Sequence, residues 1–164
     1  MATLGGDGYG PSDMVGKPIK SRVLLAEDHQ IVREGLRVLL EQGGFRVVGE
    51  AADGREAVEQ AAKLDPDVVI LDLSMPALNG IEAAREILRS HPHTQAIILT
   101  VHRDVQYVQQ AFQAGVRGYV LKTRAASELA SAILEVGDGK IYLSPDIPKK
   151  AIQPYLGGKS PNHR

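Results

Sequence analysis

Residues 68–76 read VVILDLSMP, and this stretch decides how the rest of the chain is interpreted. The run Val68–Leu71 is continuously apolar, which is typical of a parallel strand covered on both faces of a sheet. Asp72 follows directly, at the point where such a strand ends. In an open α/β sheet the carboxyl ends of the strands line the ligand-binding crevice. The stretch therefore predicts a central strand that delivers a carboxylate to a functional site.

Working outward, apolar runs that end in a polar residue recur along the chain, and a helical pattern of apolar residues follows each run. The second run is more mixed than the others and suits the edge of a sheet. This alternation predicts an α/β protein: a flavodoxin-like (βα)5 three-layer sandwich with a parallel five-stranded sheet in the order 2-1-3-4-5. The five expected strands are Val23–Ala26, Arg46–Glu50, Val68–Leu71, Ala96–Thr100 and Gly118–Leu121.

The pattern divides the chain into three parts. Residues 1–20 hold five Gly and two Pro among few apolar residues, which predicts a disordered leader. Residues 21–143 carry the five strand–helix units and form the expected domain. Residues 144–164 follow a change of character at Ser144-Pro145 and are expected to be a linker, with a short helix possible at Asp146–Leu156.

Composition narrows the class of protein. The chain is 43% hydrophobic and 24% charged, so it can bury a core. A net charge of -1, with five Tyr, two Phe and no Trp, offers neither a basic footprint nor a stacking platform for nucleic acid. The absence of Cys excludes disulfides and fits a cytoplasmic location. No apolar run approaches the roughly 18 residues of a membrane span, so no membrane partner is expected.

Charged residues at the strand ends predict a metal site. In the order 2-1-3-4-5 the first and third strands are neighbours, so Glu27 and Asp28 should meet Asp72. Like charges at about 4 Å repel by roughly 4 kcal/mol per pair at an effective dielectric of 20. Lys122, at the end of the fifth strand, can neutralise one of these charges. A divalent cation that prefers oxygen ligands, Mg²⁺, could neutralise the negative charge that remains.

The same residues suit phosphoryl transfer. A carboxylate can accept a phosphoryl group, and Asp72 is best placed to do so. Because the transition state is loose, the protein mainly positions groups and neutralises charge. Asp28 would hold the metal directly and Glu27 partly through water, while Lys122 and the hydroxyl of Thr100 would contact phosphate oxygens.

Two other classes share parts of this pattern. A flavodoxin-like flavin or nucleotide binder needs a Ser/Thr/Gly-rich loop after the first strand, whereas this chain has Glu27-Asp28-His29, which repels an anion. A phosphatase of the haloacid dehalogenase type needs Asp-x-Asp, and Asp72-Leu73-Ser74 lacks the second acid. A bound chromophore would favour the first alternative, and turnover of phosphate esters the second.

The ordered set of motifs resembles the receiver domain of two-component response regulators. The endings GYVLK at 118–122 and YLSP at 142–145 resemble the LuxR/NarL (FixJ) subfamily. The resemblance extends from about Arg22 to Tyr142. The motifs that carry it are Glu27-Asp28, DLSMP at 72–76 with Asn79-Gly80, Thr100 and Lys122.

This resemblance implies that Asp72 takes a phosphoryl group from a histidine kinase. It implies that Asp28, Asp72 and the backbone carbonyl of Ser74 bind Mg²⁺, with Thr100 and Tyr119 as a switch pair. Dimerisation on phosphorylation is implied, as is DNA binding through a C-terminal helix-turn-helix domain absent from this chain. A receiver is a phosphoacceptor and not an enzyme in the usual sense. An inactive receiver that acts only as a protein-interaction module would keep most of the same motifs.

The sequence departs from the family pattern at two positions. The first acid is Glu27, where Asp is commonest, which should keep metal binding but change its geometry. Thr123 follows Lys122 where many receivers have Pro, and this subfamily often lacks that Pro.

Overall fold

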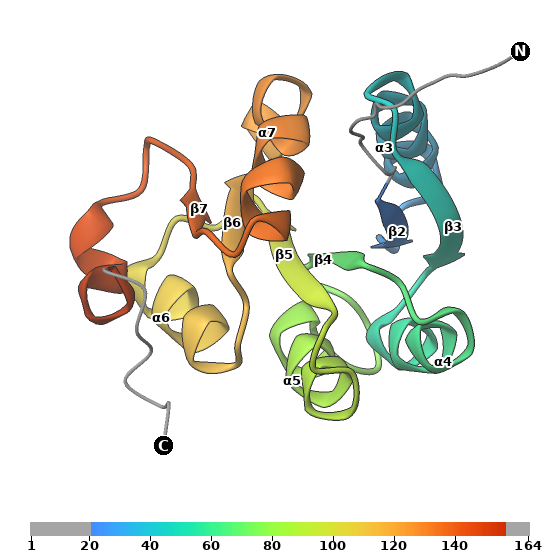
Figure 1. Cartoon of the computed structure of the whole chain (residues 1–164), viewed down its shortest axis with the longest axis horizontal. Helices are drawn as coiled ribbons and strands as arrows, with labels where there is room; N and C mark the ends of the chain where they lie inside the picture. Colours follow the sequence, from blue (N-terminus) through green and yellow to red (C-terminus); the bar gives the residue numbers. More distant parts are fainter. Residues whose placement is uncertain (1–20, 157–164) are drawn as a thin grey trace, which may run out of the picture.

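The predicted strands form one parallel sheet in the computed structural model, which describes residues 21–156 (Figure 1). The order is β3-β2-β4-β5-β6-β7, so the expected order 2-1-3-4-5 is confirmed and one further strand is added at an edge. The sheet comprises β2 (Arg22–Ala26), β3 (Arg46–Ala51), β4 (Val68–Asp72), β5 (Gln95–Thr100), β6 (Gly118–Leu121) and β7 (Tyr142–Leu143).

The additional strand β7 pairs parallel to β6, with Gly118 opposite Tyr142 and Tyr119 opposite Leu143. Two residues are too few to show the periodicity by which a strand is predicted, so the sequence pattern does not separate β7 from the loop around it.

Helices cover both faces of the sheet, as right-handed crossovers require. On one face lie α3 (Gln30–Gln42) and α7 (Ala125–Gly137), and on the other lie α4 (Gly54–Leu64), α5 (Gly80–Ser90) and α6 (Val105–Gln113) (Figure 1). Each layer has its own apolar core against the sheet. A short 3₁₀ helix, η1 (Lys122–Arg124), leads into α7.

The central strand β4 is buried at all five positions, as its unbroken apolar run predicts. Its register places Leu71 opposite Ala26 of β2, and Asp72 opposite Leu99 of β5. Thr100 of β5 in turn lies opposite Leu121 of β6. The carboxyl ends of four strands are therefore level, and the residues that follow them lie along one edge.

The segment after β7 packs against the domain that precedes it. Ile147, Ala151, Ile152 and Tyr155 are buried in the same core as α6, and the rings of Tyr155 and Phe112 have centroids 5.6 Å apart. Within this segment, η2 (Lys149–Tyr155) is a 3₁₀ helix. Residues 144–156, expected as a linker, thus cover α6, while the rest of the expected linker and the expected leader lie outside the described residues.

No helix between residues 21 and 156 is long and apolar enough to cross a membrane.

Candidate functional site

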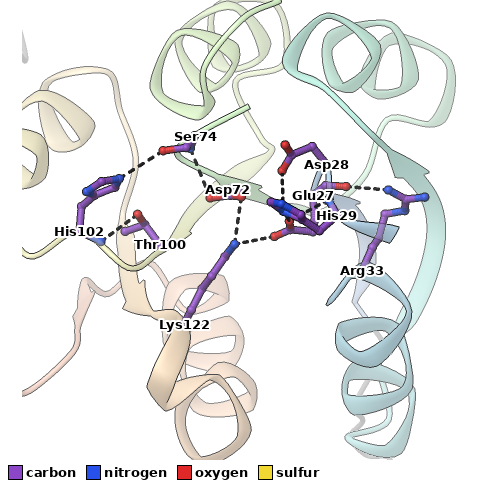
Figure 2. Close-up of polar contacts among 9 residues, drawn as sticks. All are labelled: Glu27, Asp28, His29, Arg33, Asp72, Ser74, Thr100, His102 and Lys122. Atoms are coloured by element: carbon purple, nitrogen blue, oxygen red, sulfur yellow. Dashed lines mark hydrogen bonds and ion pairs between the residues drawn. The ribbon is translucent and has the colours of Figure 1, made fainter. Parts of the chain in front are cut away.

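The predicted acids meet at the carboxyl edge of the sheet, with a lysine between two of them (Figure 2). Lys122 Nζ lies 2.8 Å from Glu27 Oε1 and 3.0 Å from Asp72 Oδ2. Both carboxylates are almost completely buried, whereas the lysine side chain is 22% exposed. One ammonium therefore bridges two carboxylates, and the site retains net negative charge.

The environment shifts the pKa values of these three groups. Burial raises the pKa of Asp72, and the nearby charge of Glu27 adds to this, in spite of the contact with Lys122. Burial also acts to raise the pKa of Glu27, but hydrogen bonds from Lys122 and from the backbone of His29 outweigh it and lower the pKa. Burial acts to lower the pKa of Lys122, and its two carboxylate partners raise it. Of the two carboxylates that Lys122 contacts, Asp72 is therefore the one whose charged form the surroundings disfavour.

Asp28 supplies the strongest indication that these residues suit a cation. Its Oδ1 atom is buried and accepts no hydrogen bond within the described part of the chain. A ring nitrogen of His29 lies 3.2 Å away. Ligand atoms of Glu27, Asp28 and His29 all lie within 4.8 Å of one another. Because a buried carboxylate oxygen without a donor is costly, the residues present fit a hard cation with oxygen ligands.

Asp28 also lines a cleft of about 390 Å³ beside the acceptor loop. Ser74, Met75 and Asn79 line the same cleft. The cleft gives a small ligand access to the edge at which the acids meet.

The loop after β4 is held close to Asp72. The backbone N–H of Ser74 donates to Asp72 Oδ1 at 3.3 Å, and the N–H of Gly80 donates to the Leu73 carbonyl at 2.9 Å. A side chain at Gly80 would place its Cβ 2.2 Å from the Asp72 carbonyl oxygen. Glycine is therefore required for α5 to begin directly beneath the acceptor, and Asn79 caps that helix through Glu82 N.

Thr100 and Tyr119 both contact the backbone of His102. The hydroxyl of Thr100 accepts a hydrogen bond from His102 N at 3.1 Å. Tyr119 is fully buried, and its hydroxyl donates to the His102 carbonyl at 2.9 Å. The same loop reaches back to the acceptor loop, because His102 Nε2 lies 3.2 Å from Ser74 Oγ (Figure 2). The two expected switch residues are therefore joined through one loop residue.

Two contacts at the site were not predicted. Arg33 of α3 donates from Nη1 to the Glu27 carbonyl at 2.7 Å and from Nε to Glu50 Oε1 at 2.9 Å. The Nδ1 atom of His29 also lies 3.1 Å from Glu27 Oε2. The position of His29 directly after the two acids could have indicated this contact from the sequence. The contacts of Arg33 could not be predicted from the sequence, because an arginine on an exposed helix face usually remains in solvent.

Comparison with known proteins identifies the family. The model of the response regulator receiver domain matches residues 23–134. The chain belongs to this family. It is 44% identical over 126 residues to the response regulator UvrY of Escherichia coli K12, which covers 76% of this chain and 58% of UvrY. This receiver spans between 58% and 65% of the length of the curated relatives it matches.

Solved structures agree with this membership. A LuxR-family two-component response regulator from Aurantimonas sp. SI85-9A1 is 39% identical, with a TM-score of 0.77 over 82% of this chain and 97% of that one. A structure of two RcsB dimers bound to two parallel DNAs is 31% identical, with a TM-score of 0.72 over 82% of this chain and 69% of that one. The predicted family, the LuxR/NarL likeness and the flavodoxin-like fold are confirmed.

Proposed function

We propose that this receiver accepts a phosphoryl group on Asp72 from a histidine kinase, with Mg²⁺ bound beside it. The observation that carries the proposal is the position of Asp72. Its carboxylate lies 3.0 Å from the Lys122 ammonium, at the same edge as the buried Asp28 Oδ1, which accepts no hydrogen bond from the residues that the structure describes. Receiver domains are phosphoacceptors, so the protein would assist its own phosphorylation and dephosphorylation instead of turning over a separate substrate.

The reaction forms one bond to phosphorus and breaks another. A carboxylate oxygen of Asp72 bonds to phosphorus while the bond from phosphorus to the donor breaks, and the donor leaves with the electron pair. With a kinase the leaving group is a histidine nitrogen, and with acetyl phosphate it is acetate. Lys122 would neutralise charge on a phosphoryl oxygen, and Thr100 would donate its hydroxyl to another.

The metal would be held by Asp28, by Asp72 and by the backbone carbonyl of Ser74, with Glu27 contributing partly through water. A bound Mg²⁺ neutralises charge on the carboxylates and on the phosphoryl oxygens. Asp28 supplies a buried oxygen that accepts no hydrogen bond within residues 21–156, and Ser74 lines the same cleft.

The switch would operate through the loop after β5. If the Thr100 hydroxyl turns to a phosphoryl oxygen, it releases His102 N, and the His102 carbonyl remains bonded to Tyr119. The loop and the ring would then move together and shift the population of active conformers.

The whole protein's role is inferred from its relatives. UvrY is named a response regulator, and RcsB dimers have been solved on DNA. By analogy, phosphorylation of this receiver in the cytoplasm would promote a homodimer and control transcription through a helix-turn-helix domain beyond residues 144–164.

Acetyl phosphate tests the proposal without a known kinase. With Mg²⁺ present, intact mass should show the gain of one phosphoryl group, and a chelator should prevent it. A folded protein that gains nothing would refute phosphoacceptance and favour regulation by binding alone.

A further inference from the structure

We infer that Arg33 is a positioning residue for the cation site, because it fixes the peptide unit between Glu27 and Asp28. Its Nη1 atom donates to the Glu27 carbonyl oxygen at 2.7 Å (Figure 2), and its Nε atom donates to Glu50 Oε1 at 2.9 Å. The Arg33 side chain is only 17% exposed, so it is held between these two acceptors. The inference rests on the proposed function, in which Asp28 binds Mg²⁺.

Both backbone groups of Glu27 are tied to the end of β3. Its N–H donates directly to the Ala51 carbonyl at 2.9 Å. Its carbonyl is tied to the preceding residue of β3 through Arg33 and the Glu50 carboxylate. Because a peptide unit is planar, fixing the Glu27 carbonyl also constrains the position of the Asp28 Cα atom, from which the metal-binding carboxylate projects.

The carboxylate that anchors Arg33 is charged and is itself held in place. Glu50 contacts both Arg33 and Arg37, two guanidinium groups one turn apart on α3. Burial acts to raise the pKa of Glu50, but hydrogen bonds from Arg37 and Arg33 outweigh it and lower the pKa. An arginine presents its N–H donors in a rigid planar fork, so the Nε contact with Glu50 orients the Nη1 atom toward the Glu27 carbonyl.

Asp28 depends on its backbone for orientation more than Glu27 does. The Glu27 carboxylate is held by Lys122 Nζ at 2.8 Å and by the backbone N–H of His29 at 3.0 Å. In contrast, Asp28 Oδ1 accepts no hydrogen bond from the described residues, and the side chain of His29 beside it is 72% exposed. Repulsion from the neighbouring carboxylates favours turning Asp28 away from the site. The Arg33 contact opposes this by limiting how far the backbone before Asp28 can move.

Loss of the Arg33 contact should therefore weaken Mg²⁺ binding and spare the chemical step. Mg²⁺ requires nearly ideal octahedral geometry, so a displaced ligand lowers its affinity. Removing a group that orients a metal ligand typically costs about 10- to 100-fold in affinity. In the described part of the chain the side chain of Arg33 contacts Glu27 and Glu50, and neither Asp72 nor Lys122.

Calorimetric titration of the full chain with Mg²⁺ alone tests the inference. Arg33→Met, which keeps the apolar stem, should raise the Mg²⁺ dissociation constant by at least about tenfold. Arg33→Lys should restore little of the affinity, because an ammonium lacks the planar fork that joins two acceptors. The matched control is Arg37→Met, one turn further along α3. It removes contacts with Glu41 and Glu50 and should bind Mg²⁺ like wild type.

Phosphorylation by acetyl phosphate gives a second readout that general damage to the fold would not reproduce. In Arg33→Met the Mg²⁺ concentration that gives half the maximal rate should rise by the same factor as the dissociation constant. The rate at saturating Mg²⁺ should stay within about twofold of wild type, because the reacting groups are untouched. A lower saturating rate with an unchanged half-saturating concentration would contradict the inference.

The outcomes separate this inference from the proposed function. Wild-type Mg²⁺ affinity in folded Arg33→Met overturns the inference alone, as does full affinity in Arg33→Lys, which would mean that the charge is sufficient. A wild type that binds no Mg²⁺ overturns the proposed function and the inference together. Should Arg33→Met fail to fold, Glu50→Gln removes the anchor instead, and it must also weaken Mg²⁺ binding for the inference to stand.

Discussion

Lys122 Nζ lies 3.0 Å from Asp72 Oδ2, although 50 positions separate the two residues in the chain. The contact exists because β4 and β6 are parallel strands on either side of β5, and each ends at the same edge of the sheet. It joins the proposed phosphoacceptor to the cation that would receive the new charge.

Removal of that cation should slow phosphorylation. In Lys122→Met the apolar stem remains and the ammonium is lost, so the rate with acetyl phosphate should fall on the order of 10²-fold, as for other lost transition-state donors. The rate is measured by intact mass over time. Lys140→Met, at an exposed position, is the control. Equal rates in the two variants would mean that Lys122 has no part in the reaction.

The raised pKa of Asp72 predicts how stability depends on pH without metal. The folded protein holds a proton on Asp72 more tightly than the unfolded chain does. Its favourable contribution is therefore complete below the unfolded pKa and is lost as pH rises through the folded pKa. At pH 7 the folded protein must keep a buried charge on Asp72 that the unfolded chain carries in water. Asp72→Asn removes this unfavourable charge, so the variant should have a larger free energy of unfolding than wild type at pH 7.

Urea unfolding in chelator, from pH 7 toward pH 4, measures this difference. It should shrink as the pH falls, and Asp138→Asn, on the exposed surface, should match wild type throughout. An Asn variant less stable than wild type at pH 7 would show that the charge of Asp72 is fully compensated.

Magnesium should stabilise the folded protein through Asp28. A ligand that binds only the folded state adds about 2.7 kcal/mol at 100 times its dissociation constant. Wild type should therefore melt at a higher temperature as Mg²⁺ is added, and Asp28→Asn should lose most of this increase. Asp138→Asn serves again as control. If Mg²⁺ raises the melting temperature of Asp28→Asn as much as that of wild type, the cation does not bind at Asp28.

Packing beneath the acceptor should not tolerate a methyl group. Gly80→Ala puts a Cβ 2.2 Å from the Asp72 carbonyl oxygen, so the backbone must move. We expect a loss of roughly 1–3 kcal/mol in unfolding free energy and slower phosphorylation. Gly137→Ala, where no atom lies within 4 Å, should change neither. If Gly80→Ala and Gly137→Ala have the same melting temperature, the close packing of Gly80 against the Asp72 carbonyl is not important for stability.

The hydroxyl of Tyr119 should matter to the switch as well as to stability. Tyr119→Phe keeps the buried ring and removes the hydrogen bond to the His102 carbonyl, which should cost about 1 kcal/mol. Phosphorylation should persist, while the resulting dimerisation weakens. Association as strong as in wild type, measured by sedimentation at equal phosphorylation, would exclude the hydroxyl from the switch.

Much of the fold could be predicted because strand and helix periodicities are local properties of the sequence. Val68–Leu71 identifies a buried strand by itself, and the strand order places Asp72 beside Glu27. The packing of residues 144–156 was not predicted, although Ile147, Ala151 and Tyr155 recur every four residues. That pattern becomes significant only once α6 offers the apolar surface that it covers.

The site residues that directly follow a strand could be predicted from the sequence. Contacts made by long side chains between separate loops or elements could not. The Ser74–His102 contact joins two loops 28 positions apart, and Arg33 meets Glu50 across 17. Neither contact can be inferred from the spacing of the residues in the sequence. Likewise, the family resemblance implies that Thr100 and Tyr119 form a switch pair, and only the structure shows that both contact His102.

The most direct test of the central claim is to locate the phosphoryl group. Wild type is treated with acetyl phosphate and Mg²⁺, the acyl phosphate is reduced with borohydride, and peptide mass spectrometry identifies the altered residue. Modification should occur at residue 72 as homoserine, and Asp72→Ala should show none. Modification at Asp28, or a phosphoryl gain that survives Asp72→Ala, would contradict the assignment of Asp72 as the acceptor.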